Sequence, residues 1–553
     1  SKPSGPLPLT SLLLFSPSKM RSPRASVMIM GSSLWILASG LVVRDIGVGR
    51  LTKRKSFALS AIPKPALVEG QKERKYAEHI DPTARYFAVE ALVEDANPGD
   101  PTSPNLGYVQ RLELHPGFRQ LEPRDRAFAR SIVSTTERRL GQIDKLLKRC
   151  QRTPDKSKQR KRHDDYCQAA LRVGAAQLLF MGVPPHAAVK ETVDVLRQVP
   201  KVPIHEPHIK YVNAVLRRIS REGDILLKNY TSVADNMSPW FRRECKKYYG
   251  KKGAKKITDA FMSQAPIFLS VNYPFKSSKE EKKSILERVE YEFSADAMPH
   301  GSLRIPDENM GGMLRDWPLY DDGLWFVQDA AATIPALALY NALKDPVTED
   351  VSDLHVVDMC AAPGGKTAQL ASLGFGKVTA IDSNPKRCLR LRKNLDRLRL
   401  RSRCRIVMED GSEWVPEKHF DVRGVLLDVP CSATGAGRRQ PDVLRREGNL
   451  ESLFADQLML ACHCADNIVQ PGGILVYATC SVLKSESEDQ VKELLARPGN
   501  QMETLPFQKG EIPGFDDCID ENGWMRVLPG DLDCDGFFVA RLRKKVDGKG
   551  LAP

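Results

Sequence analysis

The clearest pattern in the chain is a series of short apolar runs in its C-terminal half, separated by segments of helical or loop length. The runs are residues 354–358, 377–382, 405–410, 424–428 and 473–479. A last run at 535–542 completes the series. This alternation predicts a doubly wound, mostly parallel sheet of Rossmann-like α/β type over residues 321–546. The sequence Ser-Glu-Ser-Glu at 485–488 predicts a capping box that starts the helix after the run at 473–479.

The preceding part of the chain has a helical pattern. Apolar residues recur at helical spacing in segments 86–92, 127–140, 169–181, 187–196 and 211–219, which predicts an all-α domain over 78–225. The charge run at 145–162 predicts a mobile loop or insertion, whose basic end at 156–162 has no assigned role. A small α+β module is expected over 235–320, with a strand at 267–272.

The first 70 residues differ from the rest in charge. The first acidic residue is Asp45, and an uncharged stretch at 25–43 lies between two basic segments. This order predicts an organelle-targeting leader, disordered and in two parts. Residues 56–63 resemble the Phe-containing cleavage motif of plastid presequences, so a plastid is favoured over a mitochondrion, and no stable membrane association of the mature protein is expected. The alternatives are a single membrane anchor at 25–43, or a protein of the cytoplasm or nucleolus.

Composition indicates a polyanionic partner, and the cysteine spacing argues against a zinc site. The 553 residues carry a net charge of +14, which favours a polyanionic partner, although the leader and solvated basic faces supply part of this excess. Twelve cysteines are scattered along the chain. The spacing of Cys462 and Cys464 is too tight for a zinc knuckle, so we expect reduced, metal-free thiols. The basic segment 386–405 has a leucine stripe, and its arginines form a solvated face or, as an alternative, hold phosphates.

Two cysteines carry the candidate chemistry. Cys431 and Cys480 each follow an apolar run, and each is followed by a serine. The carboxyl ends of parallel strands meet at one ligand crevice, so the pattern predicts two thiols there. A thiolate is a strong nucleophile when its pKa is tuned, which indicates covalent chemistry. The alternative is a pair of small buried core residues.

A cofactor loop follows the first predicted strand, in the segment DMCAAPGGKT at 358–367. It is not a phosphate loop, because Cys360 stands where that motif requires glycine. Its small residues suit the amino-acid end of S-adenosylmethionine. Asp382 is expected to accept from the ribose hydroxyls and Asp410 from the adenine amine, although each is alternatively a cap or turn residue. The loop residues predicted to bind the cofactor are Cys360, Ala361, Ala362, Pro363, Gly364, Gly365 and Lys366.

The motifs also carry a family resemblance. DVPCSATG at 428–435 and ATCS at 478–481 look like the two signature motifs of the RsmB/Sun family of RNA cytosine-C5 methyltransferases, and the loop at 360–367 is similar to that family's cofactor motif. RRQPD at 438–442 and DGFF at 535–538 extend the match. Segments of the helical part resemble the NusB-like domain of the RsmB branch; they lie at 123–128, 171–179, 184–189 and 212–218. One departure is Ala433, where many relatives have glycine.

The resemblance implies a function and residue roles. It implies S-adenosylmethionine-dependent methylation of cytosine C5 in RNA, most of all small-subunit rRNA, by a monomer whose NusB-like domain binds RNA. Cys480 is then the nucleophile, Cys431 assists its release, and Asp428 contacts the cytosine edge or the cofactor. Arg387 joins the cofactor-binding set. The alternatives are a catalytically idle ribosome-assembly factor, a tRNA cytosine-C5 methyltransferase, and a DNA cytosine methyltransferase, against which Cys480 argues.

Overall fold

The computed structural model describes residues 83–93, 107–151, 162–199, 204–306, 313–417, 421–446 and 450–546. All of them belong to one compact unit, Lys75–Pro553. The predicted leader and residues 152–161 of the basic insertion lie outside the described residues. Among the helices in the ranges above, none is both long enough and apolar enough to cross a membrane.

The N-terminal part is helical, as predicted. Its helices are α1 (Ala84–Leu92), α2 (Tyr108–Leu114), α3 (Pro123–Arg138), α4 (Leu140–Cys150), α5 (Arg162–Phe180), α6 (Pro185–Arg197) and α7 (Glu206–Tyr230). The central helix, α5, contacts α1, α3, α4, α6 and α7. The prediction of a loop from residue 145 was wrong for its first part, because Leu146 and Leu147 are buried in the helical core and continue α4 to Cys150.

A small antiparallel sheet follows α8 (Pro239–Ala260). Its strand order is β2-β3-β1-β4, with bounds β1 (Ile267–Val271), β2 (Asp296–Ala297), β3 (Ser302–Ile305) and β4 (Trp325–Val327). Helix α9 (Lys279–Phe293) packs Val289 and Phe293 into its core. The sequence predicted that this module ends at residue 320. The structure extends it, because β4 pairs with β1.

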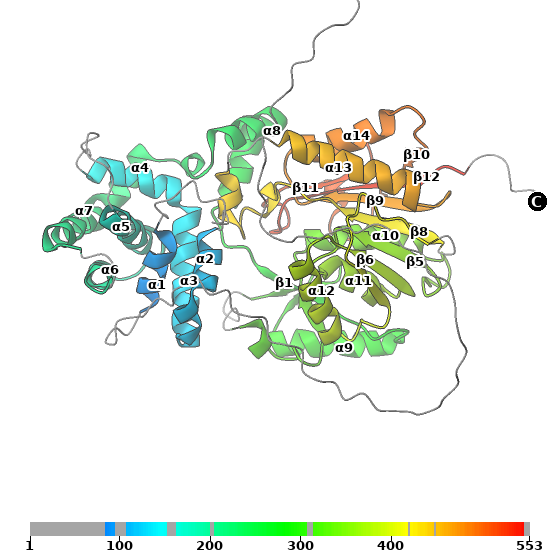
Figure 1. The fold of residues 1–553 in the computed structure, drawn as a ribbon, viewed down its shortest axis with the longest axis horizontal. Coiled ribbons are helices and arrows are strands. Elements are labelled where there is room, and N and C mark those ends of the chain that lie inside the picture. Colours follow the sequence, from blue (N-terminus) through cyan, green and yellow to red (C-terminus); the bar gives the residue numbers. More distant parts are fainter. Residues whose placement is uncertain are drawn as a thin grey trace, which may run out of the picture. The chain divides into compact units, whose positions relative to one another are not determined.

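The large sheet positions the candidate chemistry (Figure 1). Its strand order is β10-β12-β9-β8-β5-β6-β7, with β11 beside β12. The bounds are β5 (His355–Met359), β6 (Lys377–Ile381), β7 (Cys404–Val407), β8 (Val422–Asp428), β9 (Ile474–Thr479), β10 (Met502–Thr504), β11 (Met525–Val527) and β12 (Phe537–Lys544). Strands β5 to β9 are parallel and β12 is antiparallel to β9, which confirms the predicted fold class. The strand predicted at 405–410 ends earlier, at Val407.

Helices cover both faces of this sheet, because alternate strand residues point to opposite sides. In β5, Val356 packs into the core that includes residues of α10 (Ile334–Leu343), α11 (Gly365–Leu373) and α12 (Pro385–Arg397). Its neighbour Val357 packs into the opposite core, with α13 (Glu451–His463) and α14 (Glu488–Ala496). Figure 1 shows α13 and α14 on one side of the strands and α11 and α12 on the other.

The predicted capping box at 485–488 was wrong. Helix α14 begins at Glu488, and Ser485 lies in a 3-10 turn, Lys484–Glu486. The Glu488 side chain forms an ion pair with Arg526, 2.5 Å away, and accepts from the hydroxyl of Ser487, the residue that caps α14. Tertiary contacts of this segment therefore replaced the local capping interaction.

Candidate active site

The two predicted cysteines lie side by side at the carboxyl ends of neighbouring strands. Strands β8 and β9 are parallel with Asp428 opposite Ala478, so the residues that follow them share one edge of the sheet. The Cys431 and Cys480 sulfur atoms are 3.4 Å apart, and both side chains are half-buried. The structure thus brings two thiols within contact distance at an accessible position.

The environment of Cys480 keeps its thiol protonated. Its pKa is raised well above the ordinary value by the hydrogen bond with Cys431 and by burial, with a further contribution from the Asp428 carboxylate. The Lys366 ammonium acts in the opposite direction. A nucleophilic role for Cys480 therefore requires that a substrate or neighbouring base first remove its proton.

Lys366 and Asp428 form an ion pair beside the thiols. The Lys366 ammonium donates to Asp428 Oδ2 at 2.7 Å and lies 5.2 Å from the centre of the Phe537 ring. Burial lowers the pKa of Lys366, but the Asp428 carboxylate, together with Cys480 and Asp358, more than offsets this and raises it. A ligand bound beside the two thiols would therefore meet both a cation, Lys366, and an anion, Asp428.

The loop between β5 and α11 has the open backbone that its small residues predicted. Gly364 has φ +105°, and a Cβ there would lie 2.4 Å from Leu391 Cδ1. A Cβ at Gly365, the first residue of α11, would meet no atom within 4 Å. The first amides of a helix attract anions, so this end of α11 suits the carboxylate of an amino-acid ligand.

A buried carboxyl lies under this loop. Asp358 is 1% exposed, and burial raises its pKa to about 7. Its Oδ2 accepts from the Thr367 hydroxyl at 2.6 Å, whereas Oδ1 has no hydrogen-bond partner among the described residues. An unpartnered buried oxygen at the base of the loop can accept a hydrogen bond from a bound ligand, which fits an ammonium-bearing cofactor.

Asp382 and Arg387 shape the same loop from the next strand. Asp382 accepts from the Ala362 amide at 3.2 Å and forms an ion pair with Arg387 Nη2 at 3.1 Å. Arg387 also donates to the Ala362 carbonyl oxygen, 2.5 Å away. Asp410 differs, because its exposed carboxylate accepts from the Ser412 amide and hydroxyl at 2.9 and 2.8 Å, which lowers its pKa. Asp382 and Arg387 therefore contact the predicted cofactor loop, whereas Asp410 stabilises the turn that it begins.

Sequence reasoning missed Glu486, which links the two cysteine motifs. Its carboxylate is fully buried and accepts from the Ser432 amide at 2.8 Å and from Gln457 Nε2 at 3.1 Å. The hydroxyls of Ser432 and Ser481 also donate to it. Ser432 follows Cys431 and Ser481 follows Cys480, so this one side chain fixes both cysteine loops. The serine after each cysteine was the visible signal, but nothing local identified the shared acceptor.

The motifs at 438–442 and 535–538, with Gly435, pack behind the two cysteine loops. Gly435 and Gly536 are in backbone contact, and a Cβ on Gly435 would lie 2.2 Å from the Gly536 oxygen. Arg439 pairs with Asp535 and Asp329 at 2.8 Å each. Burial raises the pKa of Asp535 to about 7, with Asp329 adding to the shift. These motifs therefore serve to hold the cysteine loops against β12.

Comparisons with known proteins agree with this arrangement. The family model described as 16S rRNA methyltransferase RsmB/F matches residues 344–543, and the NusB family model matches residues 82–221. The ribosomal RNA small subunit methyltransferase B of Shewanella oneidensis is 33% identical over 76% of this chain and 91% of its own length. That of Escherichia coli O157:H7 is 32% identical over 78% of this chain and 94% of its own length.

A solved structure has the same fold over most of the chain. The crystal structure of PH0851 superposes with a TM-score of 0.60 at 22% identity, covering 84% of this chain and 99% of the other. The 33% identity to the Shewanella relative, together with the family model, shows that the chain belongs to the RsmB/F family of methyltransferases. It is an S-adenosylmethionine-dependent RNA methyltransferase with an N-terminal NusB-like domain, as the sequence resemblance predicted.

Proposed function

We propose that this protein methylates C5 of a cytosine in small-subunit ribosomal RNA, through a covalent bond between Cys480 and C6 of the base. The observation that carries the proposal is the 3.4 Å separation of the Cys431 and Cys480 sulfur atoms beside the Lys366–Asp428 pair. The names of the bacterial relatives support small-subunit rRNA as the substrate.

Residues of the β5–α11 loop are suited to hold the cofactor, with Asp382 and Arg387 fixing the loop's shape. The Gly365 end of α11 would receive its carboxylate, and the free oxygen of Asp358 its ammonium. When bound, S-adenosylmethionine supplies an electrophilic methyl group. The side chains of this protein and the cytosine carry out the bond-forming and proton-transfer steps described next.

The cytosine carbon C5 is a weak nucleophile until C6 is attacked. The Cys480 thiol gives its proton to N3 of the cytosine as its sulfur forms a bond to C6. The ring then contains an enamine, whose electron-rich C5 takes the methyl group. A base must next remove the C5 proton. The electron pair of that C–H bond restores the C5–C6 double bond, and the S–C6 bond breaks with its electrons returning to Cys480. N3 returns its proton to Cys480. Cys431, hydrogen-bonded to Cys480, is our candidate for the base that takes the C5 proton; it acts as a thiolate and later releases that proton to water.

Lys366 and Asp428 orient the base while this occurs. Attack at C6 increases negative charge on the ring, which a nearby ammonium stabilises. The Asp428 carboxylate can accept from the cytosine amine, a group that uracil lacks. Its pairing with Lys366 at 2.7 Å keeps this acceptor fixed in the absence of substrate. Asp428 thus supplies a physical basis for cytosine selection.

The direct test is bisulfite sequencing of rRNA from cells with and without the protein. The proposal expects one or a few cytosines of small-subunit rRNA to lose protection when the protein is absent. Unchanged protection throughout rRNA, with loss at a tRNA cytosine, would favour the tRNA alternative. Unchanged protection in all RNA would favour an idle assembly factor.

We propose further that the protein acts in an organelle, with a plastid favoured. The acid-poor, basic and apolar composition of residues 1–70 supports this proposal, as does the likeness to bacterial relatives. Fusion of residues 1–70 to a fluorescent protein should direct it to the plastid. Retention of that fusion in the cytoplasm or nucleolus would contradict the proposal. We also propose a monomer, which light scattering after gel filtration measures.

A further inference from the structure

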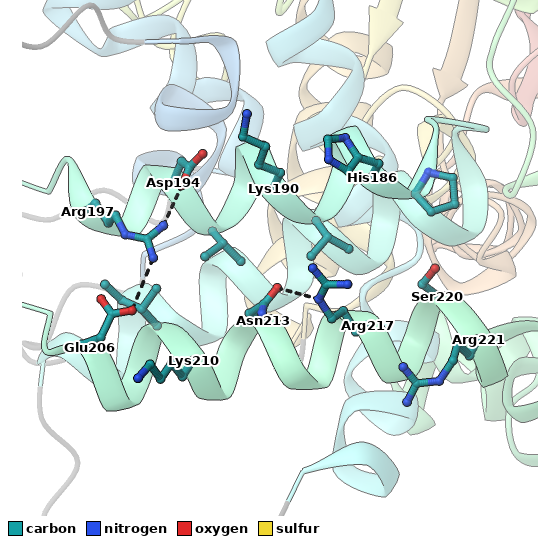
Figure 2. A pocket seen from close by; sticks show the side chains of 14 residues that line it. His186, Lys190, Asp194, Arg197, Glu206, Lys210, Asn213, Arg217, Ser220 and Arg221 are labelled. Atoms are coloured by element: carbon teal, nitrogen blue, oxygen red, sulfur yellow. Dashed lines mark hydrogen bonds and ion pairs between the residues drawn. The ribbon is translucent and has the colours of Figure 1, made fainter.

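A cationic groove runs between α6 and α7 of the helical domain, away from the residues assigned to catalysis. It has a volume of about 710 Å³, and its floor includes the buried side chains Val189, Val193 and Ile209. Figure 2 shows the two helices side by side with polar side chains along both rims. The basic residues that line the groove are His186, Lys190, Arg197, Lys210, Arg217 and Arg221.

Charge is distributed unevenly along the groove. At one end Arg197 bridges Asp194 and Glu206, at 2.6 and 3.4 Å, so its charge is neutralised (Figure 2). Toward the other end Arg217 donates to the neutral amide oxygen of Asn213, at 3.2 Å, and forms no ion pair with the residues that the structure describes. The Arg197 end of the groove, where Lys210 also lies, thus contains both carboxylates that line the groove, and the Arg217 end is lined by cations without a carboxylate.

Along its whole length the groove also carries exposed cations that form no ion pair with a described residue. Within the ranges that the structure describes, Lys190, Lys210 and Arg221 have no carboxylate at ion-pair distance, and all three are exposed. Like charges on a solvated surface repel each other. A partner that carries negative charges at regular intervals interacts with them favourably. A polyanion is such a partner.

The spacing of these cations fits a linear ligand. Lys210, Arg217 and Arg221 lie seven and four residues apart on α7, which places them on one face of the helix. Eleven residues of α helix span about 16 Å, the length of a few stacked nucleotides. Lys190 approaches the same line from α6. Cations along one line, over a groove whose apolar floor is already buried, suit a phosphate backbone better than an apolar protein segment.

We propose that this groove binds the phosphate backbone of the RNA substrate, through Lys190, Lys210, Arg217 and Arg221. The proposal rests on the proposed function, and it assigns the RNA-binding surface to one face of the helical domain. Phosphate contacts fix register and orientation without reading sequence, so the groove would hold the RNA while Asp428 selects the cytosine.

The test compares the full chain with a triple variant, Lys190→Gln, Lys210→Gln and Arg221→Gln. A matched control, Lys279→Gln, Lys282→Gln and Lys283→Gln, removes three exposed cations from α9. The probe is a fluorescein-labelled, single-stranded RNA of about 20 nucleotides and mixed sequence, with binding followed by anisotropy between 50 and 200 mM salt. A polyglutamate peptide serves as the acidic-protein probe, and S-adenosylmethionine binding checks that each variant is folded.

Loss of three phosphate contacts should reduce the slope of log affinity against log salt by about 2. Over that salt range the wild-type protein should then lose roughly 20-fold more affinity than the triple variant, whereas the α9 control should match the wild type. Equal slopes and affinities for wild type and triple variant would overturn the proposal. Loss of polyglutamate binding with RNA binding unchanged would also overturn it, in favour of an acidic protein.

Methyl transfer to rRNA, measured in parallel, separates this proposal from the proposed function. If the wild type methylates rRNA and the triple variant binds RNA equally well, the groove proposal alone fails. If the triple variant loses RNA binding but the wild type methylates no cytosine, the groove stands and the proposed function fails.

Discussion

Replacing Glu486 with alanine should separate the two thiols without touching either of them. Its buried carboxylate accepts from the Ser432 amide and from Gln457 Nε2, at 2.8 and 3.1 Å, and from two serine hydroxyls. The hydroxyls of Ser432 and Ser481 would keep Thr434 Oγ1 as a partner, at 3.2 and 3.0 Å. The Ser432 amide would keep none.

These contacts set the expected magnitude. An unsatisfied buried donor costs about 1–3 kcal/mol, and a hydrogen bond to a charged acceptor contributes about 1.5–3 kcal/mol. Glu486→Ala should therefore destabilise the cysteine loops by about 3–5 kcal/mol. Glu486→Gln keeps the volume and one acceptor oxygen, so it should cost about 1–2 kcal/mol.

The catalytic effect follows from displacement. A shift of about 1 Å at a reacting group can reduce rate by about 100-fold. We expect kcat to fall by about that factor in Glu486→Ala and by less than about 10-fold in Glu486→Gln, with KM for S-adenosylmethionine nearly unchanged. Steady-state kinetics with a tritiated methyl donor measure both.

Two results would refute this reasoning. If Glu486→Gln is as inactive as Glu486→Ala, the charge of Glu486 takes part in the chemistry and its role is not positioning. If Glu486→Ala has the wild-type kcat, strands β8 and β9 position the thiols without the carboxylate.

Three further changes have defined outcomes. Gly435→Ala should abolish methyl transfer and lower the melting temperature, because its Cβ would lie 2.2 Å from the Gly536 oxygen and 2.6 Å from the Cys480 oxygen; normal activity would show that the loops can move apart freely. Ala433→Gly should raise the free energy of unfolding by up to about 1 kcal/mol, since Ala433 has φ +55°; a denaturation curve shifted to lower urea would contradict this. Asp358 has a folded pKa of about 7 against an ordinary 3.8, so its contribution to stability declines as pH rises from about 4 to 7. Asp358→Asn should flatten that decline in melts at pH 5 and pH 8, and an unchanged decline would assign it to other groups.

Much of the fold was predictable because its signals are local. The strands of the large sheet are apolar runs of the right length, and Leu391 and Leu395 of α12 are buried as their spacing predicted. Strand ends were less certain, as β7 shows, because the ladder ends at Val407 whereas the expected end, Asp410, lies in the turn that follows. The link between β4 and the small sheet was not predictable, because the pairing of β4 with β1 joins residues more than fifty positions apart.

The candidate site divides in the same way. Cys431 and Cys480 could be placed together because parallel strands share one edge, and the loop at 360–367 is local in sequence. Glu486 was hidden because its partners lie at positions 432, 457 and 481. The capping box failed for a similar reason, because its Glu488 forms an ion pair with Arg526, which is distant in sequence.

The measurement that tests the central claim most directly is trapping of the RNA–protein intermediate. Cys431→Ala and Cys480→Ala proteins are incubated with small-subunit rRNA and S-adenosylmethionine and run on a denaturing gel, and the linked peptide is identified by mass spectrometry. Cys431→Ala should give a slowly migrating RNA–protein band linked through Cys480, because the methylated base cannot be released, and Cys480→Ala should give no band and no methylation. A band with Cys480→Ala and none with Cys431→Ala would reverse the two roles, and methylation by Cys480→Ala would contradict the covalent mechanism.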